Sequence, residues 1–371
     1  MSVGDARHWQ AMPEGGERVP LWVTAVTVVL LVGGFNSRGN ARGRPAEGPN
    51  GARASTGHDR GRHATTPSEI PARGWKDIGL RVYRNISTHR VLAIAAGVTF
   101  YSILAIFPAI AALVSLYGLF ADAGTIGAQL DQVAGVLPSG AIDVLREQMT
   151  RVASQGGGTL GLTFAIGLLA ALWSSNAGMK ALFDALNVVY GEEEKRGFFK
   201  LNAVSLAFTT GAILFLLVAM AAVVVLPVAL NFVGLGGASD LLIRLVRWPL
   251  LLVAIILALA VLYRYGPSRD LPRWRWTTWG SAFAAVAWVI ASILFSWYAA
   301  NFGSYNETYG SLGAVIGFMI WIWISAIVIL VGAELDAEME HQTARDTTVG
   351  QPRPLGRRGA AVADTVGASQ G

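Results

Sequence analysis

One apolar segment, Leu312 to Ala333, constrains this chain more than any other feature of its sequence. It runs for 22 residues without a charged side chain, long enough for a helix to cross the roughly 30 Å hydrocarbon core of a bilayer. Gly310, Gly313 and Gly317 lie near its start at spacings of three and four, and small residues so spaced let membrane helices approach closely. We therefore expect a membrane-spanning helix packed inside a bundle, with these three glycines at a helix contact.

The remaining sequence supports such a bundle. Only 14% of the residues are charged, against roughly 25% in soluble domains, and several other apolar runs have the length of a membrane span. Six core spans are predicted, at about 91–119, 159–179, 201–232, 246–263, 276–300 and 312–333. The first contains Pro108, which removes a helical hydrogen bond and predicts a kink or break there. The predicted fold class is an all-α, polytopic membrane helix bundle.

Outside this core, the sequence changes in character. Residues 1–35 form a polar tail ending in an apolar run, 19–35, that is expected to be an uncleaved anchor helix; its 17 residues leave open whether it spans the bilayer. Residues 36–73, rich in Gly, Arg, Pro, Ser and Thr, are expected to be a disordered linker. Residues 74–340 are expected to form the membrane domain and 341–371 a disordered cytoplasmic tail.

Two segments have apolar residues at helical spacing without being apolar throughout. Trp75, Ile78, Val82 and Ile86 predict an amphipathic helix on the inner surface of the membrane. The region 122–155 has two such apolar faces, which predict two short helices outside the bilayer.

The distribution of Lys and Arg predicts the orientation of the spans. Residues 73–90, 180–200, 264–275 and the tail after 334 together contain seventeen, whereas the alternate segments, 121–158, 235–247 and 301–311, contain four. Because cytoplasmic loops carry the excess of Lys and Arg, both ends of the six-span core are expected in the cytoplasm. The net charge of +5 fits the same bias, so nucleic acid is not an expected partner.

Several stretches resemble one protein family along the whole core. They are AAGVTFYSILAIFP (95–108), LWSSNAGMKALFDALNVVYG (172–191), YRYGP (263–267), NFGSYNETYGSLGAVI (301–316) and GAELDAE (332–338). In these stretches and their order, residues 74–340 resemble the YihY/BrkB family of bacterial membrane proteins, known as virulence factors and formerly as ribonuclease BN. Asp336 stands where the family often has Asn. The resemblance implies a six-helix protein of the bacterial inner membrane whose molecular activity is poorly defined.

The sequence offers little for catalysis. There is no cysteine, which excludes disulfides, thiolate metal sites and cysteine nucleophiles. A nuclease would need a metal-binding carboxylate cluster or acid–base groups placed on phosphate, but the histidines are scattered over tails, linker and loop. We therefore expect no catalytic, cofactor-binding or metal-binding residues, and ribonuclease activity is not expected.

A set of polar residues is expected to gather at one membrane depth. Asn176, Lys180, Asp184 and Asn187 recur at intervals of four, four and three on one helix face. Arg264 ends the fourth predicted span and Glu334 the sixth. These six residues are expected to form a network near the cytoplasmic surface, with Lys180 and Glu334 paired across the bundle as a gate if the protein transports. The alternative is that they are separate anchors reaching the interface.

The spans themselves suggest what the protein handles. None has a charge near its centre, which argues against a proton- or sodium-coupled carrier of the usual design. A lipid-like or other amphipathic substrate, whose tails stay in the bilayer, is more compatible. The alternative function is a non-transporting scaffold or envelope-integrity factor. An open cavity between the spans would favour transport and a sealed bundle would favour the scaffold; the oligomeric state is left open.

Overall fold

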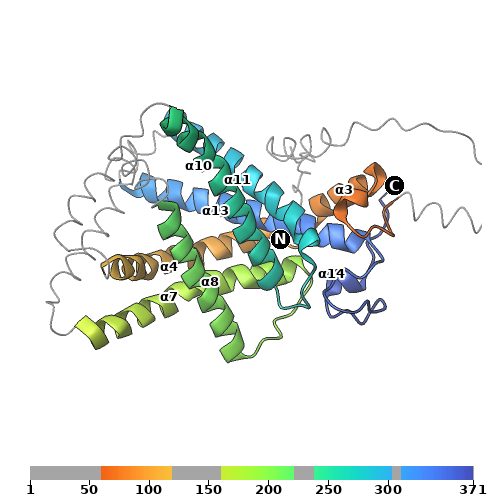
Figure 1. Ribbon diagram of the computed structural model, residues 1–371, viewed down its shortest axis with the longest axis horizontal. Coiled ribbons are helices and arrows are strands. Elements are labelled where there is room, and N and C mark those ends of the chain that lie inside the picture. The colour runs from red at the N-terminus through yellow and green to blue at the C-terminus, as the bar shows by residue number, and fades with distance from the viewer. Residues whose placement is uncertain (1–59, 119–159, 221–237, 303–310, 371) are drawn as a thin grey trace, which may run out of the picture. The chain divides into compact units, whose positions relative to one another are not determined.

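A computed structural model of the protein describes residues 60–118, 160–220, 238–302 and 311–370 (Figure 1). These contain long helices of 23 to 32 residues: α4 (Val91–Gly118), α7 (Leu160–Val189), α8 (Phe198–Met220), α10 (Ala238–Tyr265), α11 (Trp274–Phe302) and α13 (Ser311–Gln342). Shorter elements are the 3₁₀ turn η1 (Pro67–Glu69), α3 (Ala72–Thr88) and α14 (Ala361–Asp364). An isolated β-bridge between Pro272 and Thr348 is the sole extended pairing in the described ranges. The prediction of an all-α fold is confirmed.

Several of these helices are long and apolar enough to cross a bilayer. Four segments qualify in the described part of the chain: Phe198–Ala219, Trp248–Tyr265, Trp274–Ala299 and Val315–Gln342. A fifth is added if the bent pair Ala72–Thr88 and Val91–Ile106 is one span. The protein is therefore a helical membrane protein, while the predicted count of six core spans is not confirmed by these four or five. The predicted anchor at 19–35 and the two helices within 122–155 lie outside the described residues.

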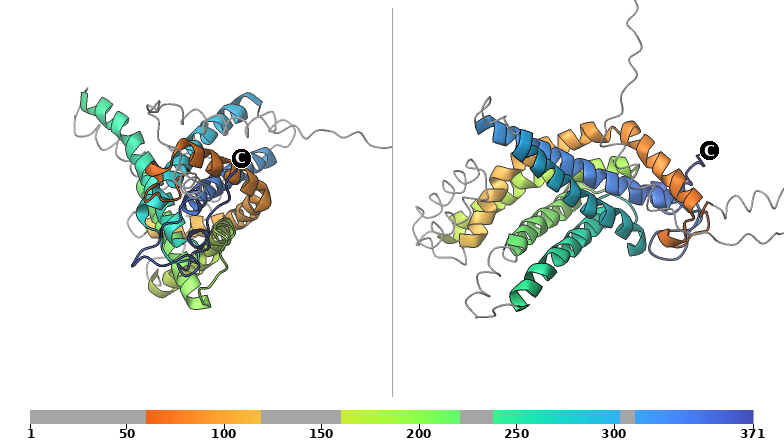
Figure 2. Two further views of the ribbon diagram at one scale, coloured as in Figure 1. Left: turned by 90° about the vertical axis from the view of Figure 1, so that its right-hand side faces the viewer. Right: turned by 90° about the horizontal axis from the view of Figure 1, so that it is seen from above.

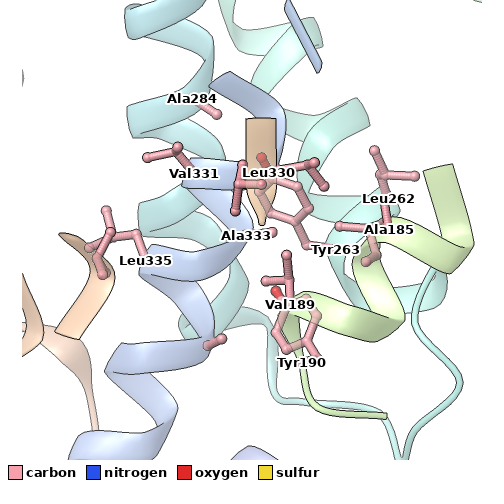
Figure 3. Close-up of a cluster of buried hydrophobic side chains, with 14 of the residues drawn as sticks. Ala185, Val189, Tyr190, Leu262, Tyr263, Ala284, Leu330, Val331, Ala333 and Leu335 are labelled. Atoms are coloured by element: carbon pink, nitrogen blue, oxygen red, sulfur yellow. The ribbon is translucent and has the colours of Figure 1, made fainter. Parts of the chain in front are cut away.

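Helix α13 is the element around which the others pack. It lies against α11, α4, α3 and α7 (Figure 2). Around its second half, a buried cluster joins Leu330 and Ala333 of α13 to Tyr263 of α10, Ala284 of α11 and Tyr190, the residue after α7 (Figure 3). Elsewhere the long helices expose large apolar side chains, among them Leu169, Val218 and Ile293. Such surfaces suit contact with lipid tails and not with water.

The closest helix contact joins α11 and α13. A Cβ added at Gly280 would lie 2.2 Å from the carbonyl oxygen of Gly332, and one added at Gly332 would lie 2.6 Å from the Cβ of Ala284. Only residues without a side chain allow this approach, because real Cβ atoms do not come so near to other heavy atoms.

This contact differs from the one predicted at the start of the same helix. At Gly317 a Cβ would meet no described atom within 4 Å. Gly310 lies outside the described residues, and so do the surroundings of Gly313. The close approach is about four turns further along, at Gly332. The reason is that the partner must also be small: α11 offers Gly280 and Ala284, one turn apart, at that level.

Of the kink or break predicted at Pro108, the break is absent, since α4 continues through this residue. The sharp bend lies instead between α3 and α4, whose axes differ by 60°. At this bend Arg90 has a φ of 52°, a left-handed conformation that is uncommon for a residue with a side chain.

The tail after α13 is folded in the structure, although its composition predicts disorder. Arg358 is buried, and its guanidinium donates to the carbonyl oxygens of Ala344, Arg345 and Ala363. The tail is also tied to the α10–α11 connection by the backbone bonds Arg273 N–Thr347 O, Val349 N–Leu271 O and Asp270 N–Gly359 O, of 2.9, 2.9 and 3.1 Å. Composition missed this because backbone and guanidinium hydrogen bonds, not apolar residues, hold the segment.

Residues 60–73 are likewise described, although they belong to the predicted linker. Ala344 N donates to Arg62 O at 2.9 Å, which joins this segment to the tail. We call residues 60–90, 190–200, 264–273 and 334–370, which meet at one end of the helices, the polar cap.

Candidate binding site in the polar cap

The polar cap is organised by the last turns of α13. This helix is 32 residues long, about 48 Å at 1.5 Å per residue, and therefore continues beyond the length of a hydrocarbon core. Its final part carries four carboxylates, all of them buried: Glu334, Asp336, Glu338 and Glu340. Buried carboxylates need partners, and each of these has at least one.

Two of these carboxylates accept hydrogen bonds from the α10–α11 connection, from α11 and from the tail. Glu340 accepts two hydrogen bonds from Arg269, of 2.7 and 3.2 Å, and one of 2.9 Å from the hydroxyl of Thr347. Oδ1 of Asp336 accepts the backbone N–H of Gly280 at 2.7 Å. These bonds fix α13 to α11 and to the α10–α11 connection.

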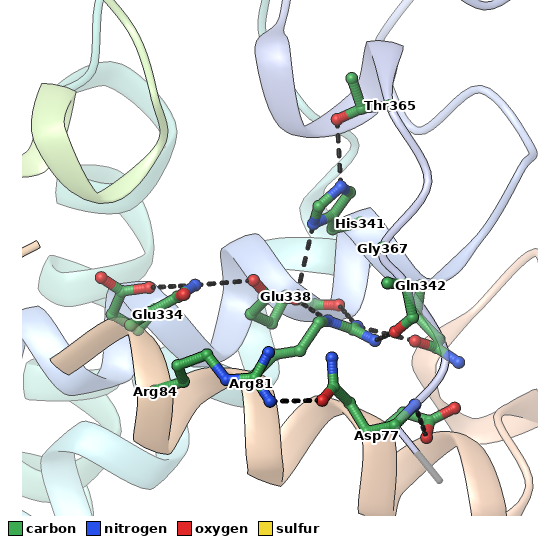
Figure 4. Close-up of polar contacts among 12 residues, drawn as sticks. Asp77, Arg81, Arg84, Glu334, Glu338, His341, Gln342, Thr365 and Gly367 are labelled. Atoms are coloured by element: carbon green, nitrogen blue, oxygen red, sulfur yellow. Dashed lines mark hydrogen bonds and ion pairs between the residues drawn. The ribbon is translucent and has the colours of Figure 1, made fainter. Parts of the chain in front are cut away.

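The other two carboxylates face α3. Glu338 binds the guanidinium of Arg81 and accepts from Asn85 Nδ2 at 2.8 Å (Figure 4). Oε1 of Glu334 lies 2.5 Å from Nδ1 of His89, and Asn85 is 3.5 Å from its other oxygen. Arg81 also donates to Gln342 Oε1 at 2.7 Å. The result is a ladder of polar pairs between two helices.

This ladder corresponds to a matching four-residue spacing of polar residues in the two helices. On α3, Asp77, Arg81 and Asn85 are spaced by four residues, with His89 four further on; on α13, Glu334, Glu338 and Gln342 have the same spacing. Residues four apart share a helix face. Arg81, which is not part of the apolar face predicted from Ile78 and Val82, is nevertheless buried against α13.

The predicted polar network is divided in the structure. The ammonium of Lys180 lies 5.4 Å from the centre of the Trp173 ring, and Asp184 is exposed. Asn176 is buried and accepts from the hydroxyl of Thr209 at 3.2 Å. In the described residues no ion pair joins Lys180 to Glu334, whose partners are on α3. The expected pair fails because equal depth in the bilayer does not place two side chains on facing sides of their helices.

Of the remaining two residues of that network, Arg264 belongs to the polar cap and Asn187 lies near it at the end of α7, but both bind other partners. Asn187 accepts the backbone N–H of Ser268 at 2.7 Å and donates to Glu194 at 3.2 Å, which holds the end of α7 to the α10–α11 connection. Arg264 donates to the carbonyl oxygen of Pro272 and stacks on Trp274, 4.4 Å from the ring centre. Both side chains position the connections between helices.

A pocket of about 430 Å³ lies within the polar cap, a size typical of small-molecule sites. Its walls come from α3, the end of α7, α13 and the tail around α14. Four residues that carry or can gain positive charge line it, namely Arg81, Arg84, His89 and His341. In the described lining Glu338 is the sole acidic residue, so cationic groups prevail in the pocket.

The charge of His89 depends on its contact with α13. The hydrogen bond to Glu334 raises the pKa of His89 above its ordinary value, despite the opposing effect of burial. The neighbouring negative charges of Glu334 and Glu338 act in the same direction. His89 therefore retains its proton to higher pH than a free histidine does.

Metal binding finds no support in the ranges that the structure describes. There, no group of three or more His, Asp or Glu side chains is placed to hold a metal ion. Three carboxylates of α13 are instead paired with arginine or histidine, and that of Asp336 accepts a backbone N–H.

Comparisons with known proteins agree on one family. The sequence profile described as virulence factor BrkB matches residues 82–355. The putative ribonuclease-like protein YfkH of Bacillus subtilis is 30% identical over 268 residues, which are 69% of this chain and 92% of that protein. A UPF0761 membrane protein of Ralstonia nicotianae is 28% identical over 254 residues, 66% of this chain and 55% of the relative. Another, of Alkalilimnicola ehrlichii, is 27% identical over 284 residues, 75% of this chain and 61% of the relative.

The chain thus spans nearly all of the Bacillus protein but little more than half of the other two. No solved structure gives a significant match. The profile covers most of the chain, from the second half of α3 to beyond the end of α13. This chain therefore belongs to the virulence factor BrkB family of membrane proteins.

Proposed function

We propose that this protein handles or transports a lipid-like or other amphipathic molecule in the bacterial inner membrane, with six core spans and the polar cap on the cytoplasmic side. The orientation is supported by the bias of seventeen Lys and Arg against four between alternate segments. The polar cap contains most of these Lys and Arg residues, and it brings them together at one end of the helices.

One observation carries this proposal. The pocket of the polar cap is lined by the end of α7 and by the part of α13 that follows its apolar segment, and its lining combines arginines and histidines with Val189, Ala337 and Val362. A charged lining that adjoins lipid-facing helices suits a molecule with a polar head and an apolar tail. Leu92 and Val188 are exposed and lie three residues and one residue from the lining residues His89 and Val189, so they provide apolar surface along which the tail can lie.

Native mass spectrometry of the full chain, released from mild detergent, tests this proposal. We expect the protein to retain an amphipathic molecule that appears as a defined added mass. Val362→Trp, which fills the pocket from the tail, should remove the added mass. Val349→Trp, which places the same side chain at an exposed position of the tail outside the pocket, should keep it. Wild-type protein that carries no amphipathic molecule would contradict the proposal.

A second candidate is a non-transporting scaffold. It is favoured by the positions of two pockets in the described residues, because both are lined by the polar cap and neither lies between the apolar helices. If the protein is a scaffold, native mass spectrometry should detect no bound molecule. Crosslinking in intact cells should then capture protein partners at the polar cap or at residues 122–155.

Catalysis is not part of the proposal. One relative is named ribonuclease-like, but the acidic residues of the polar cap are held by Arg81, Arg269 and His89 and are not arranged around a metal site. The purified protein should leave RNA intact in the presence of Mg²⁺, and cleavage that disappears in Glu338→Gln would contradict this part.

A further inference from the structure

Three arginines of the polar cap donate hydrogen bonds to the end of the tail. Nη2 of Arg62 donates to Gly367 O at 2.5 Å, Nη1 of Arg81 to Ala368 O at 3.1 Å, and Nη2 of Arg84 to the side-chain oxygen of Gln370 at 2.7 Å. All three acceptors are neutral oxygens. Guanidinium groups form markedly stronger hydrogen bonds with carboxylate or phosphate oxygens. The tail therefore occupies donors that an anion would bind more strongly.

Two of these arginines, Arg81 and Arg84, line the pocket of about 430 Å³, and Ala368 and Gln370 form part of the wall beside them. Glu338 is the one negative group in the described lining, but it already binds Arg81 and Asn85. Its charge is thus offset by Arg81, and the guanidinium of Arg84 adds a further positive charge. His341 also lines the pocket and lies 3.6 Å from Glu338.

The position of Arg84 on α3 indicates where an anion would come from. The opposite face of this helix, with Ile78 and Val82, is buried, whereas Leu80 and Tyr83 are 43% and 51% exposed. An amphipathic helix with exposed apolar residues lies at a membrane surface. In such a position Arg84, one residue after Tyr83 and four after Leu80, would lie near the lipid headgroups.

We propose that this pocket binds a phosphate group carried by a membrane amphiphile, and that tail residues 367–370 occupy its arginines until the phosphate enters. The inference rests on the proposed function and specifies the headgroup of its substrate. The tail is a competitor because its carbonyl and amide oxygens use the same Nη donors that a phosphate would use. Displacing the tail therefore makes Arg81 and Arg84 available together.

Gly367 provides a way to displace the tail. A Cβ at this residue would lie 2.7 Å from Cζ of Arg81, closer than real Cβ contacts, so the tail reaches the arginine because residue 367 has no side chain. Gly367→Leu should push the tail away from the pocket. Ser369→Leu is the matched control, because it adds the same side chain two residues later at an exposed position.

The experiment is calorimetric titration of the full chain in detergent with three probes: short-chain phosphatidic acid, the diacylglycerol of the same chains, and inorganic phosphate. We expect phosphatidic acid to bind and diacylglycerol not to bind. Arg84→Gln should weaken the binding of phosphatidic acid by about tenfold, as expected for the loss of one charge-assisted hydrogen bond. Gly367→Leu should bind phosphatidic acid several-fold more tightly than wild type, while Ser369→Leu should bind it with the affinity of wild type.

Each of the following outcomes would overturn one part of this proposal. If phosphatidic acid binds equally to Arg84→Gln and to wild type, this pocket is not its binding site. The proposed function would still stand if mass spectrometry finds a bound amphiphile. Inorganic phosphate that binds as tightly as phosphatidic acid excludes a membrane amphiphile as the ligand. Weaker binding in Gly367→Leu excludes competition by the tail. A melting temperature of Arg84→Gln equal to that of wild type confirms that this exposed substitution leaves the protein folded.

Discussion

Arg269 and Glu340 form a bidentate ion pair in which both side chains are completely buried, although the two residues lie 71 positions apart in the sequence. The guanidinium also stacks on Tyr190, 4.1 Å from its ring centre. This one side chain therefore joins the α10–α11 connection, the end of α7 and the end of α13. A buried pair of this kind fixes the arrangement of the helices around it.

Removing one partner of this pair should destabilise the protein strongly. Arg269→Ala leaves the carboxylate of Glu340 buried without its cation, which costs about 3–5 kcal/mol. Denaturant unfolding of the full chain in detergent measures the loss. The matched control is Arg353→Ala, which breaks the half-exposed ion pair with Asp270 and should cost less than about 1 kcal/mol. Equal losses in the two variants would contradict a structural role for the buried pair.

The contact between α11 and α13 predicts a position-specific effect of glycine substitution. Gly332→Leu should sharply lower the yield of folded protein, because its side chain would overlap Ala284 and the hydroxyl of Tyr263. Gly317→Leu, on the same helix, meets open space in the described structure and should be tolerated. Size-exclusion chromatography of the two variants in detergent gives the comparison, and a poorer profile for Gly317→Leu would place the contact where the sequence motif predicted it.

These glycines illustrate what the sequence could and could not predict. The helical class, the apolar segments and the family follow from local composition and from motifs along the core. The partner of a glycine does not, because Gly332 and Gly280 lie on different helices and nothing local to Gly332 distinguishes it from Gly317. A motif of spaced glycines identifies a helix that can be approached, but the approach itself depends on the neighbour.

The same distinction holds for the polar cap. The depth of Glu334 in the bilayer stays a prediction, which rests on its position at the end of a charge-free segment. Its partner was not predictable from that depth, since depth says nothing about rotation around the helix axis. The four-residue spacing of Arg81, Asn85 and His89 matches that of Glu334 and Glu338, and this match was the available signal for their pairing. The folded tail was least predictable, because hydrogen bonds from Arg358 to carbonyl oxygens have no pattern in the sequence.

The contact between His89 and Glu334 predicts how stability changes with pH. The pKa of His89 is raised in the folded protein by its hydrogen bond to Glu334, so the folded state holds this proton more tightly than the unfolded chain does. The stabilisation is complete below the unfolded pKa of about 6.5 and is lost as the pH rises through the higher folded value. Glu334 and Glu338 are the charged groups that face the imidazole.

Unfolding measurements at a series of pH values above 6 test this contact. Wild-type protein should lose stability as the pH rises through the window above about 6.5, and His89→Gln should show a flatter profile there. An identical pH profile for the two proteins would show that His89 does not hold a proton against Glu334.

The central claim is that the segments of the polar cap lie together on the cytoplasmic side of a membrane bundle. Because the chain has no cysteine, single cysteines placed at Glu194, Asp270, Val349 and Asn306 can be labelled without background by a membrane-impermeant thiol reagent. The first three should react only after the inner membrane is opened, and the cysteine at residue 306 should react in intact spheroplasts. Labelling of any polar-cap cysteine in intact spheroplasts, at the rate found for residue 306, would contradict the account.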